Sequence, residues 1–135
     1  MKIEIATELD FQYIVDHDTH LLQSLVLAKI KGKEIYIIRN HEDKNIGWMR
    51  YGYFWDNTPF MNMIWIDESD RGHGIGRQVV LLWEQEMRQN GFTLVMTSTL
   101  ANEEAQHFYR KLGYKDAGCL LLDNEPLEII LTKLI

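Results

Sequence analysis

The stretch Arg71-Gly72-His73-Gly74-Ile75-Gly76 decides the fold of this chain. An apolar segment at residues 60–67 precedes it, and a segment with helical periodicity at residues 77–89 follows it. Glycines at alternate positions allow a tight turn and let backbone N–H groups approach a ligand closely. The first turn of a helix adds unpaired N–H groups and the positive end of the helix dipole. The pattern therefore predicts an anion-binding loop, most often used for phosphate, between a strand and a helix.

The composition is that of an ordinary globular protein, and 135 residues are enough for one domain spanning residues 1–135. No signal-peptide core or membrane-length apolar run is present, so we expect a cytoplasmic protein with no membrane partner. The single cysteine, Cys119, excludes an internal disulfide and is expected to be a small buried residue. The net charge of -6 disfavours nucleic-acid binding; it is compatible with a cationic substrate or with solubility alone.

Hydrophobic patterning predicts seven strands and four helices. In the helix at 77–89, the apolar stripe contains Val79, Leu82 and Trp83, and Glu84 is expected to face away from it. Thr7 is expected to cap the first helix, and Asn102 is expected to cap the last one. The strand at 60–67 is apolar on both faces and is expected to be buried on both. The strands lie at residues 2–5, 34–39, 45–53, 60–67, 92–100, 114–122 and 127–134, and the helices follow Thr7 or span 21–31, 77–89 and 102–112.

Hairpins come before a strand–helix–strand unit, so the sheet should be mixed and the class α+β. The cluster Asp16-His17-Asp18-Thr19-His20 has no known metal-ligand spacing. We therefore expect a solvated helix junction there and no metal site. If the protein has a substrate cleft, the two helices that meet at this junction could still form one wall of it.

Two common nucleotide-binding loops do not fit the glycine stretch. A P-loop requires a Lys-Ser/Thr pair after its last glycine, and Gly76 is followed by Arg77-Gln78. A dinucleotide fingerprint has the spacing Gly-x-Gly-x-x-Gly and an acidic residue at the end of the second strand. Here the spacing is Gly-x-Gly-x-Gly, and the second strand ends in Thr97-Ser98-Thr99.

Residues 64–89 resemble motif A of the GCN5-related N-acetyltransferase (GNAT) superfamily, whose signature is Arg/Gln-x-x-Gly-x-Gly/Ala. Arg71, Gly74 and Gly76 match that signature. Residues 102–114 resemble the family's motif B, through Asn102, Ala105, Phe108, Tyr109 and the pair Gly113-Tyr114. The two motifs cover about half of the chain, and the order of elements outside them also matches the family.

The resemblance implies acetyl-CoA, or another short acyl-CoA, as the cofactor. It also implies a mostly antiparallel sheet whose central strands splay into a V-shaped slot. N–H groups of the glycine loop would bind the pyrophosphate, the backbone at residues 64–66 would pair with the pantetheine arm, and Asn102 would contact the cofactor from the rim. The residues implied to bind the cofactor are Ile64, Trp65, Ile66, Arg71, Gly72, His73, Gly74, Ile75, Gly76, Arg77, Asn102, Ala105, Phe108 and Tyr109.

The chemistry implied by the resemblance is direct attack of a primary amine, from a small molecule or a peptide, in a ternary complex. Tyr109 would be the general acid that protonates the departing thiolate; a core tyrosine with a satisfied hydroxyl is the structural alternative. A backbone N–H near Ile64 or Ile66 would bind the oxyanion. The base stays open: Glu68 is a candidate although many relatives carry proline there, Asn62 could hold a water, and Asp56, Asp123 and Glu125 are alternatives from loops.

Three further questions stay open. A non-catalytic acyl-CoA-binding sensor or interaction module would share the same loop. Aromatic residues could line an apolar amine pocket, and exposed strand edges make a homodimer possible. The aromatic residues in question are Trp48, Tyr51, Tyr53, Phe54 and Trp55.

Overall fold

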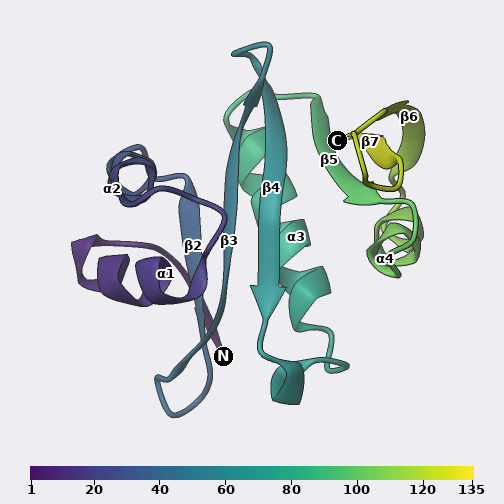
Figure 1. Cartoon of the computed structure of the whole chain (residues 1–135). Coiled ribbons are helices and arrows are strands. Elements are labelled where there is room, and N and C mark those ends of the chain that lie inside the picture. The colour runs from purple at the N-terminus through teal and green to yellow at the C-terminus, as the bar shows by residue number, and fades with distance from the viewer. The chain divides into compact units, whose positions relative to one another are not determined.

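The computed structural model describes residues 1–135. Its seven strands form one sheet in the order β1-β2-β3-β4-β5-β7-β6 (Figure 1). The pair β4–β5 is parallel, whereas β1–β2, β2–β3, β5–β7 and β6–β7 are antiparallel. The elements are β1 (Lys2–Ile5), η1 (Glu8–Asp10), α1 (Phe11–His17), α2 (Gln23–Lys31), β2 (Ile35–Arg39), β3 (Asn45–Phe54), β4 (Thr58–Ile66), η2 (Glu68–Asp70), α3 (Ile75–Gln89), β5 (Leu94–Leu100), α4 (Ala105–Lys111), β6 (Lys115–Leu120) and β7 (Glu128–Leu134). The predicted mixed, mostly antiparallel α+β architecture is confirmed.

The chain groups into two compact units. The first unit contains residues 1–51 and 63–79, and the second contains residues 52–62 and 80–135. Strands β3 and β4 and helix α3 each begin in one unit and end in the other. No helix combines the length and apolar composition that crossing a membrane requires.

The core of the first unit forms where α1 and α2 pack beside β2 and β3 (Figure 1). β2 is a run of isoleucine and tyrosine, and its first four residues are buried. Thr7 caps the turn η1 that leads into α1, and it exchanges hydrogen bonds with Asp10 in a capping box, as predicted. The core residues shared by helices and strands are Ile14, Val26, Ile30, Ile35, Ile37 and Trp48.

The core of the second unit is organised by β5. β5 pairs with β7 along its whole length, from Leu94 opposite Leu134 to Leu100 opposite Glu128. β6 lies at the edge of the sheet with β7 as its only neighbour, and all its residues are exposed. The prediction that Cys119 is buried is therefore wrong, because Cys119 lies on this edge strand and is exposed.

Two helix predictions need correction. Asn102 does not cap α4: the helix begins at Ala105, after a turn in which the Glu103 N–H donates to the Leu100 carbonyl at 3.0 Å. The Gln106 side chain donates to the carbonyls of Ala101 and Glu103 and so stabilises that turn in place of a longer helix. On α3, Val79 and Trp83 are buried as predicted, but Glu84 is also buried, with 2% of its surface exposed. A helical wheel cannot show that a polar partner reaches Glu84 from elsewhere in the chain.

Candidate active site

The glycine loop joins β4 to α3 in the first unit. Gly72 and Gly74 have φ values of +80° and +79°, in the left-handed region that favours glycine. A Cβ atom added at either position would meet no atom within 4 Å, so packing does not require these glycines. The Gln78 N–H donates to the Gly74 carbonyl at 3.1 Å, which begins the hydrogen bonding of α3. The predicted strand, glycine turn and helix N-terminus are confirmed, and the backbone there lies open to a ligand.

Two side chains hold this loop to its surroundings. Arg71 donates from Nε to the Ile66 carbonyl at 2.7 Å, and its guanidinium lies 4.6 Å from the centre of the Trp65 ring. The His73 ring nitrogen Nδ1 is 3.2 Å from the Asp70 carbonyl. Arg71, placed among the cofactor-binding residues by the motif, thus anchors the loop to the end of β4.

The direction of the β4 backbone groups follows from its contact with β3. The Asp67 N–H donates to the Ile46 carbonyl at 2.7 Å, and a Cβ atom on Gly47 would lie only 2.2 Å from the Trp65 carbonyl oxygen. Trp65 and Asp67 therefore direct backbone groups toward β3. Because such groups alternate along a strand, those of Ile64 and Ile66 point the opposite way. The Ile66 carbonyl already accepts from Arg71. The groups that remain on the side of β4 facing away from β3 are the backbone N–H and carbonyl of Ile64 and the N–H of Ile66.

Tyr109 lies on α4 in the second unit and is 6% exposed. Burial raises the pKa of its phenol to about 12, and a hydrogen bond with Thr97 opposes that rise. The Thr97 hydroxyl donates to the Met61 carbonyl at 3.0 Å, from a position directly opposite Met61 in the parallel pair. The Thr97 oxygen can therefore accept from the phenol. At neutral pH Tyr109 carries its proton.

A buried charge cluster supports the neighbourhood of Tyr109. The Tyr114 ring meets the Tyr109 ring edge to face at 5.7 Å, and its hydroxyl donates to Glu84 at 2.9 Å. Lys133 donates to the other Glu84 oxygen at 2.7 Å. Burial and the Glu84 charge raise the pKa of Tyr114. Sequence reasoning missed this cluster, although a glutamate between Trp83 and Met87 and a lysine in an apolar strand were its signals.

One buried polar atom in the second unit has no protein partner. Thr99 on β5 is 5% exposed, and its hydroxyl oxygen makes no hydrogen bond. Buried hydroxyl groups are normally paired, because leaving one unpaired costs about 1–3 kcal/mol. This orphaned hydroxyl therefore marks a place where a ligand group would be accommodated.

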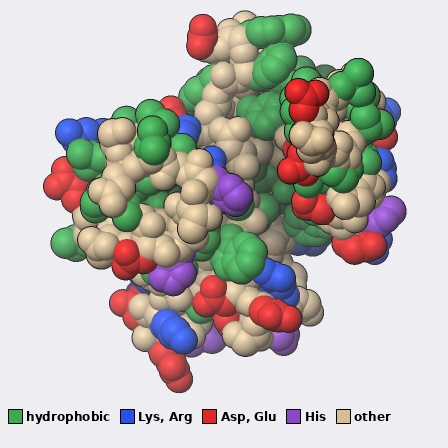
Figure 2. All heavy atoms as spheres, in the orientation of Figure 1, with side chains coloured by type: hydrophobic (Ala, Val, Ile, Leu, Met, Phe, Trp, Pro, Cys, Tyr) green, Lys and Arg blue, Asp and Glu red, His purple; other side chains and the backbone are tan.

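The predicted base candidates are not held in a defined site. Glu68 lies in η2 and Asn62 on β4; both are exposed, and neither side chain makes a hydrogen bond. Asp56 sits at the tip of the β3–β4 hairpin, where it and Trp55 have positive φ values of 60° and 55°. Figure 2 shows hydrophobic and acidic side chains at that tip, and Trp55 is 80% exposed.

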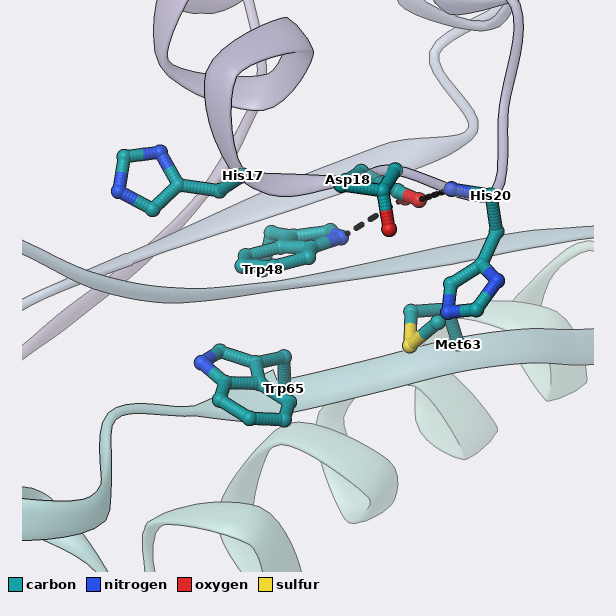
Figure 3. A pocket seen from close by; sticks show the side chains of 7 residues that line it. His17, Asp18, His20, Trp48, Met63 and Trp65 are labelled. Atoms are coloured by element: carbon teal, nitrogen blue, oxygen red, sulfur yellow. Dashed lines mark hydrogen bonds between the residues drawn. The ribbon is translucent and has the colours of Figure 1, made fainter.

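A pocket of about 270 Å³ lies in the first unit where α1 ends (Figure 3). The predicted solvated helix junction is therefore wrong for Asp18, which is 2% exposed. The pocket lining includes the end of α1 but no residue of α2, so a substrate-cleft wall formed by the two helices stays a prediction. The expectation that the 60–67 strand is buried on both faces is also wrong, because Trp65 is 43% exposed. The lining residues are His17, Asp18, Thr19, His20, Trp48, Met63 and Trp65.

Asp18 holds together the part of the pocket wall that follows α1. It accepts from Arg50 Nε at 2.7 Å, from Trp48 Nε1 at 3.1 Å and from the His20 backbone N–H at 3.2 Å. Burial alone would favour the neutral acid, but hydrogen bonding and the charge of Arg50 outweigh it and hold the pKa of Asp18 below its usual range. The carboxylate is thus ionised and fully engaged by protein donors.

Solved structures of known proteins share the fold of this chain. Ard1 from Thermoplasma volcanium matches with a TM-score of 0.83 at 14% identity, over 99% of this chain and 97% of that one. The ribosomal-protein-alanine N-acetyltransferase from Brucella melitensis matches with a TM-score of 0.79 at 16% identity, over 100% of both chains. A Bacillus anthracis str. Ames protein solved in complex with acetyl coenzyme A matches with a TM-score of 0.68 at 24% identity, over 75% of this chain and 61% of that one. Curated protein sequences gave no match.

The solved structures are all distant in sequence and establish the fold. The family profile described as "Acetyltransferase (GNAT) family" matches residues 3–114, which include the glycine loop and the segment from Asn102 to Tyr114. Members of that family use acetyl-CoA and transfer its acetyl group to an amine. Because the match extends over most of its length, the chain belongs to the GNAT family of N-acetyltransferases.

Proposed function

We propose that this chain is an acetyl-CoA-dependent N-acetyltransferase that works as a single domain on a primary amine of a small molecule or peptide. The observation that carries the proposal is the glycine loop at residues 71–76. Its two left-handed glycines have open space above them, and α3 begins directly after them. This is the arrangement that an anionic diphosphate requires.

The residues present fit acetyl-CoA. Backbone N–H groups of the loop and of the first turn of α3 would hold the pyrophosphate. The backbone N–H and carbonyl of Ile64, together with the Ile66 N–H, would pair with the amides of the pantetheine arm. A further polar atom of the cofactor would form a hydrogen bond with the Thr99 hydroxyl, which has no partner in the protein. Bound acetyl-CoA supplies an electrophilic thioester carbon and a thiolate leaving group.

The proposed reaction is a direct transfer. The amine nitrogen gives one proton to a base and bonds to the thioester carbon, a backbone N–H at Ile64 or Ile66 donates to the developing oxyanion, and the carbon–sulfur bond then breaks. Tyr109 donates its proton to the departing thiolate. Burial raises the pKa of this phenol to about 12, so Tyr109 is protonated at neutral pH and has a proton to donate. Thr97 holds the phenol in orientation while donating to Met61.

Replacing Tyr109 with phenylalanine separates an enzyme from a CoA-binding module. For Tyr109→Phe we expect a kcat for thiol release on an amine panel about 10²-fold lower, the order of a general-acid contribution. The Kd for CoA, measured by calorimetry, should stay unchanged. A parent protein that binds CoA and acetylates no amine would instead be a binding module, and unchanged kcat in Tyr109→Phe would remove Tyr109 from the mechanism.

A matched pair of glycines tests the loop itself. Gly74 and Gly91 have similar φ values, +79° and +94°, and open space at the Cβ position. Gly74→Ala and Gly91→Ala should therefore lose similar stability, on the order of 1 kcal/mol. Only Gly74→Ala should weaken CoA binding, by about tenfold or more, because Gly91 lies after the far end of α3. Equal CoA affinities would contradict the pyrophosphate assignment.

A further inference from the structure

The pocket at the end of α1 has apolar walls. Trp48 and Trp65 lie roughly parallel, with ring centres 6.2 Å apart and planes at 29°, and the Met63 side chain lies near them (Figure 3). Its volume of about 270 Å³ is at the small end of ligand-binding cavities. A ligand body of about one aromatic ring suits this space.

The charges around the pocket limit the ligand further. Asp18 is the only acid in the lining, and its oxygens accept from Arg50, Trp48 and the His20 N–H. No carboxylate is left to hold a second ammonium group. A polyamine would therefore bring a charge that nothing in the lining neutralises, whereas a monoamine would not.

His20 is the polar side chain that remains available. Its ring makes no hydrogen bond within the protein, whereas the His17 ring nitrogen Nδ1 is 2.7 Å from the Tyr13 carbonyl. Figure 3 shows the His20 ring directed toward Met63. Met63 directly precedes Ile64 in β4. The Asp18 carboxylate fixes the His20 backbone and with it the start of the side chain.

We propose that this pocket binds the acceptor, a monoamine with one aromatic ring or a similarly compact apolar body, and that His20 is its general base. The inference rests on the proposed function. The substrate amine gives one proton to the free imidazole nitrogen as its carbon–nitrogen bond forms, and His20 becomes imidazolium. The charged or titratable groups around it are His17, the pair Asp18–Arg50, and Arg71 behind the Trp65 ring; β4 contributes neutral Met63 and Trp65.

The substrate class is tested with 2-phenylethylamine and spermidine, each with saturating acetyl-CoA and measured by thiol release. We expect kcat/KM to favour 2-phenylethylamine by about tenfold or more. Trp65→Ala should raise its KM about tenfold with little change in kcat, because Trp65 forms a wall and takes no part in proton transfer. A preference for spermidine, or an unchanged KM, would overturn the substrate assignment.

The base is tested with His20→Gln and, as a matched control, His41→Gln in the exposed β2–β3 turn. His20→Gln should lower kcat about 10²-fold, with the KM for acetyl-CoA unchanged. His41→Gln should behave as the parent protein does. A kcat within threefold of the parent in His20→Gln would overturn the assignment of His20.

The two levels of inference fail differently. A parent protein that binds no CoA in calorimetry would overturn the proposed function and this inference together. A parent protein that binds CoA and acetylates other amines, without preferring the aromatic monoamine, would overturn only the inference.

Discussion

Two buried carboxylates, Asp18 in the first unit and Glu84 in the second, are stabilised in the same way. Each residue is 2% exposed, and each carboxylate accepts from one cation and one ring donor. Asp18 has Arg50 and Trp48, and Glu84 has Lys133 and Tyr114. They differ in what lies beside them, since Asp18 lines a pocket whereas Glu84 sits among packed rings. A buried charge is thus structural in both places, and only the space beside Asp18 adds a possible site.

The two ion pairs, Asp18–Arg50 and Glu84–Lys133, also differ in how deeply the cation is buried. The Arg50 side chain is 9% exposed, whereas the Lys133 side chain is 20% exposed and its flexible stem can carry the ammonium toward water. Removing a carboxylate leaves its cation uncompensated, and that penalty grows with burial. The same deletion should therefore cost more at Asp18.

The largest effect is expected for Asp18→Ala. The substitution leaves Arg50, the Trp48 ring N–H and the His20 N–H buried without their acceptor. We therefore expect a loss of about 4 kcal/mol in the free energy of unfolding. Urea unfolding followed by fluorescence measures it. Asp16→Ala, at an exposed position of α1 two residues earlier, is the control and should change stability by less than about 0.5 kcal/mol. Equal losses in the two variants would contradict the structural role of Asp18.

Glu84→Ala should cost somewhat less, about 3 kcal/mol, because Lys133 can reach solvent and the other donor, Tyr114, is uncharged. Gln85→Ala, at the next and exposed position of α3, is its control. The variant is measured by the same urea titration. If Glu84→Ala proved more costly than Asp18→Ala, the ranking by depth would be wrong.

The pH dependence of stability sharpens the comparison. Arg50 keeps the pKa of Asp18 in the folded state below its value in the unfolded chain. The stabilisation is therefore complete above the unfolded pKa of about 4 and is lost as pH falls through the folded value. The stability gap between the parent protein and Asp18→Asn should narrow between pH 5 and pH 2. Asp16→Asn should show no such narrowing, and a constant gap for Asp18→Asn would show that its charge is not stabilised.

The sequence predicted the fold well because local rules decide it. The seven strands, the four helices, the Thr7 cap and the glycine turn each depend on residues within a few positions of one another. The turn before α4 was not predicted. The Gln106 side chain donates to the Ala101 carbonyl and stabilises that turn, so the helix begins only at Ala105 and not after Asn102. Residue spacing alone does not rank this interaction against a cap at Asn102.

The pocket and the buried charges could not be predicted in the same way. Asp18 and Arg50 are 32 positions apart, and Glu84 and Lys133 are 49 positions apart, so no local pattern links the members of either pair. The cluster at residues 16–20 carried a signal, but without its distant partners a solvated junction was the natural interpretation. The residues expected to bind the cofactor at the glycine loop lie close in sequence, so a local pattern was enough to propose them.

The smallest effect is expected where the same pairing occurs at the surface. Arg110 donates to Asp116 from Nε and from its terminal nitrogen, both at 3.0 Å, yet the two side chains are 35% and 55% exposed. Hydrogen bonding with Arg110 lowers the pKa of Asp116, but water and salt compensate either charge when its partner is removed. Asp116→Ala should therefore leave the urea midpoint unchanged, in low salt and in 1 M salt alike. A loss comparable to that of Glu84→Ala would mean that two short hydrogen bonds, rather than burial, set the cost of breaking these pairs.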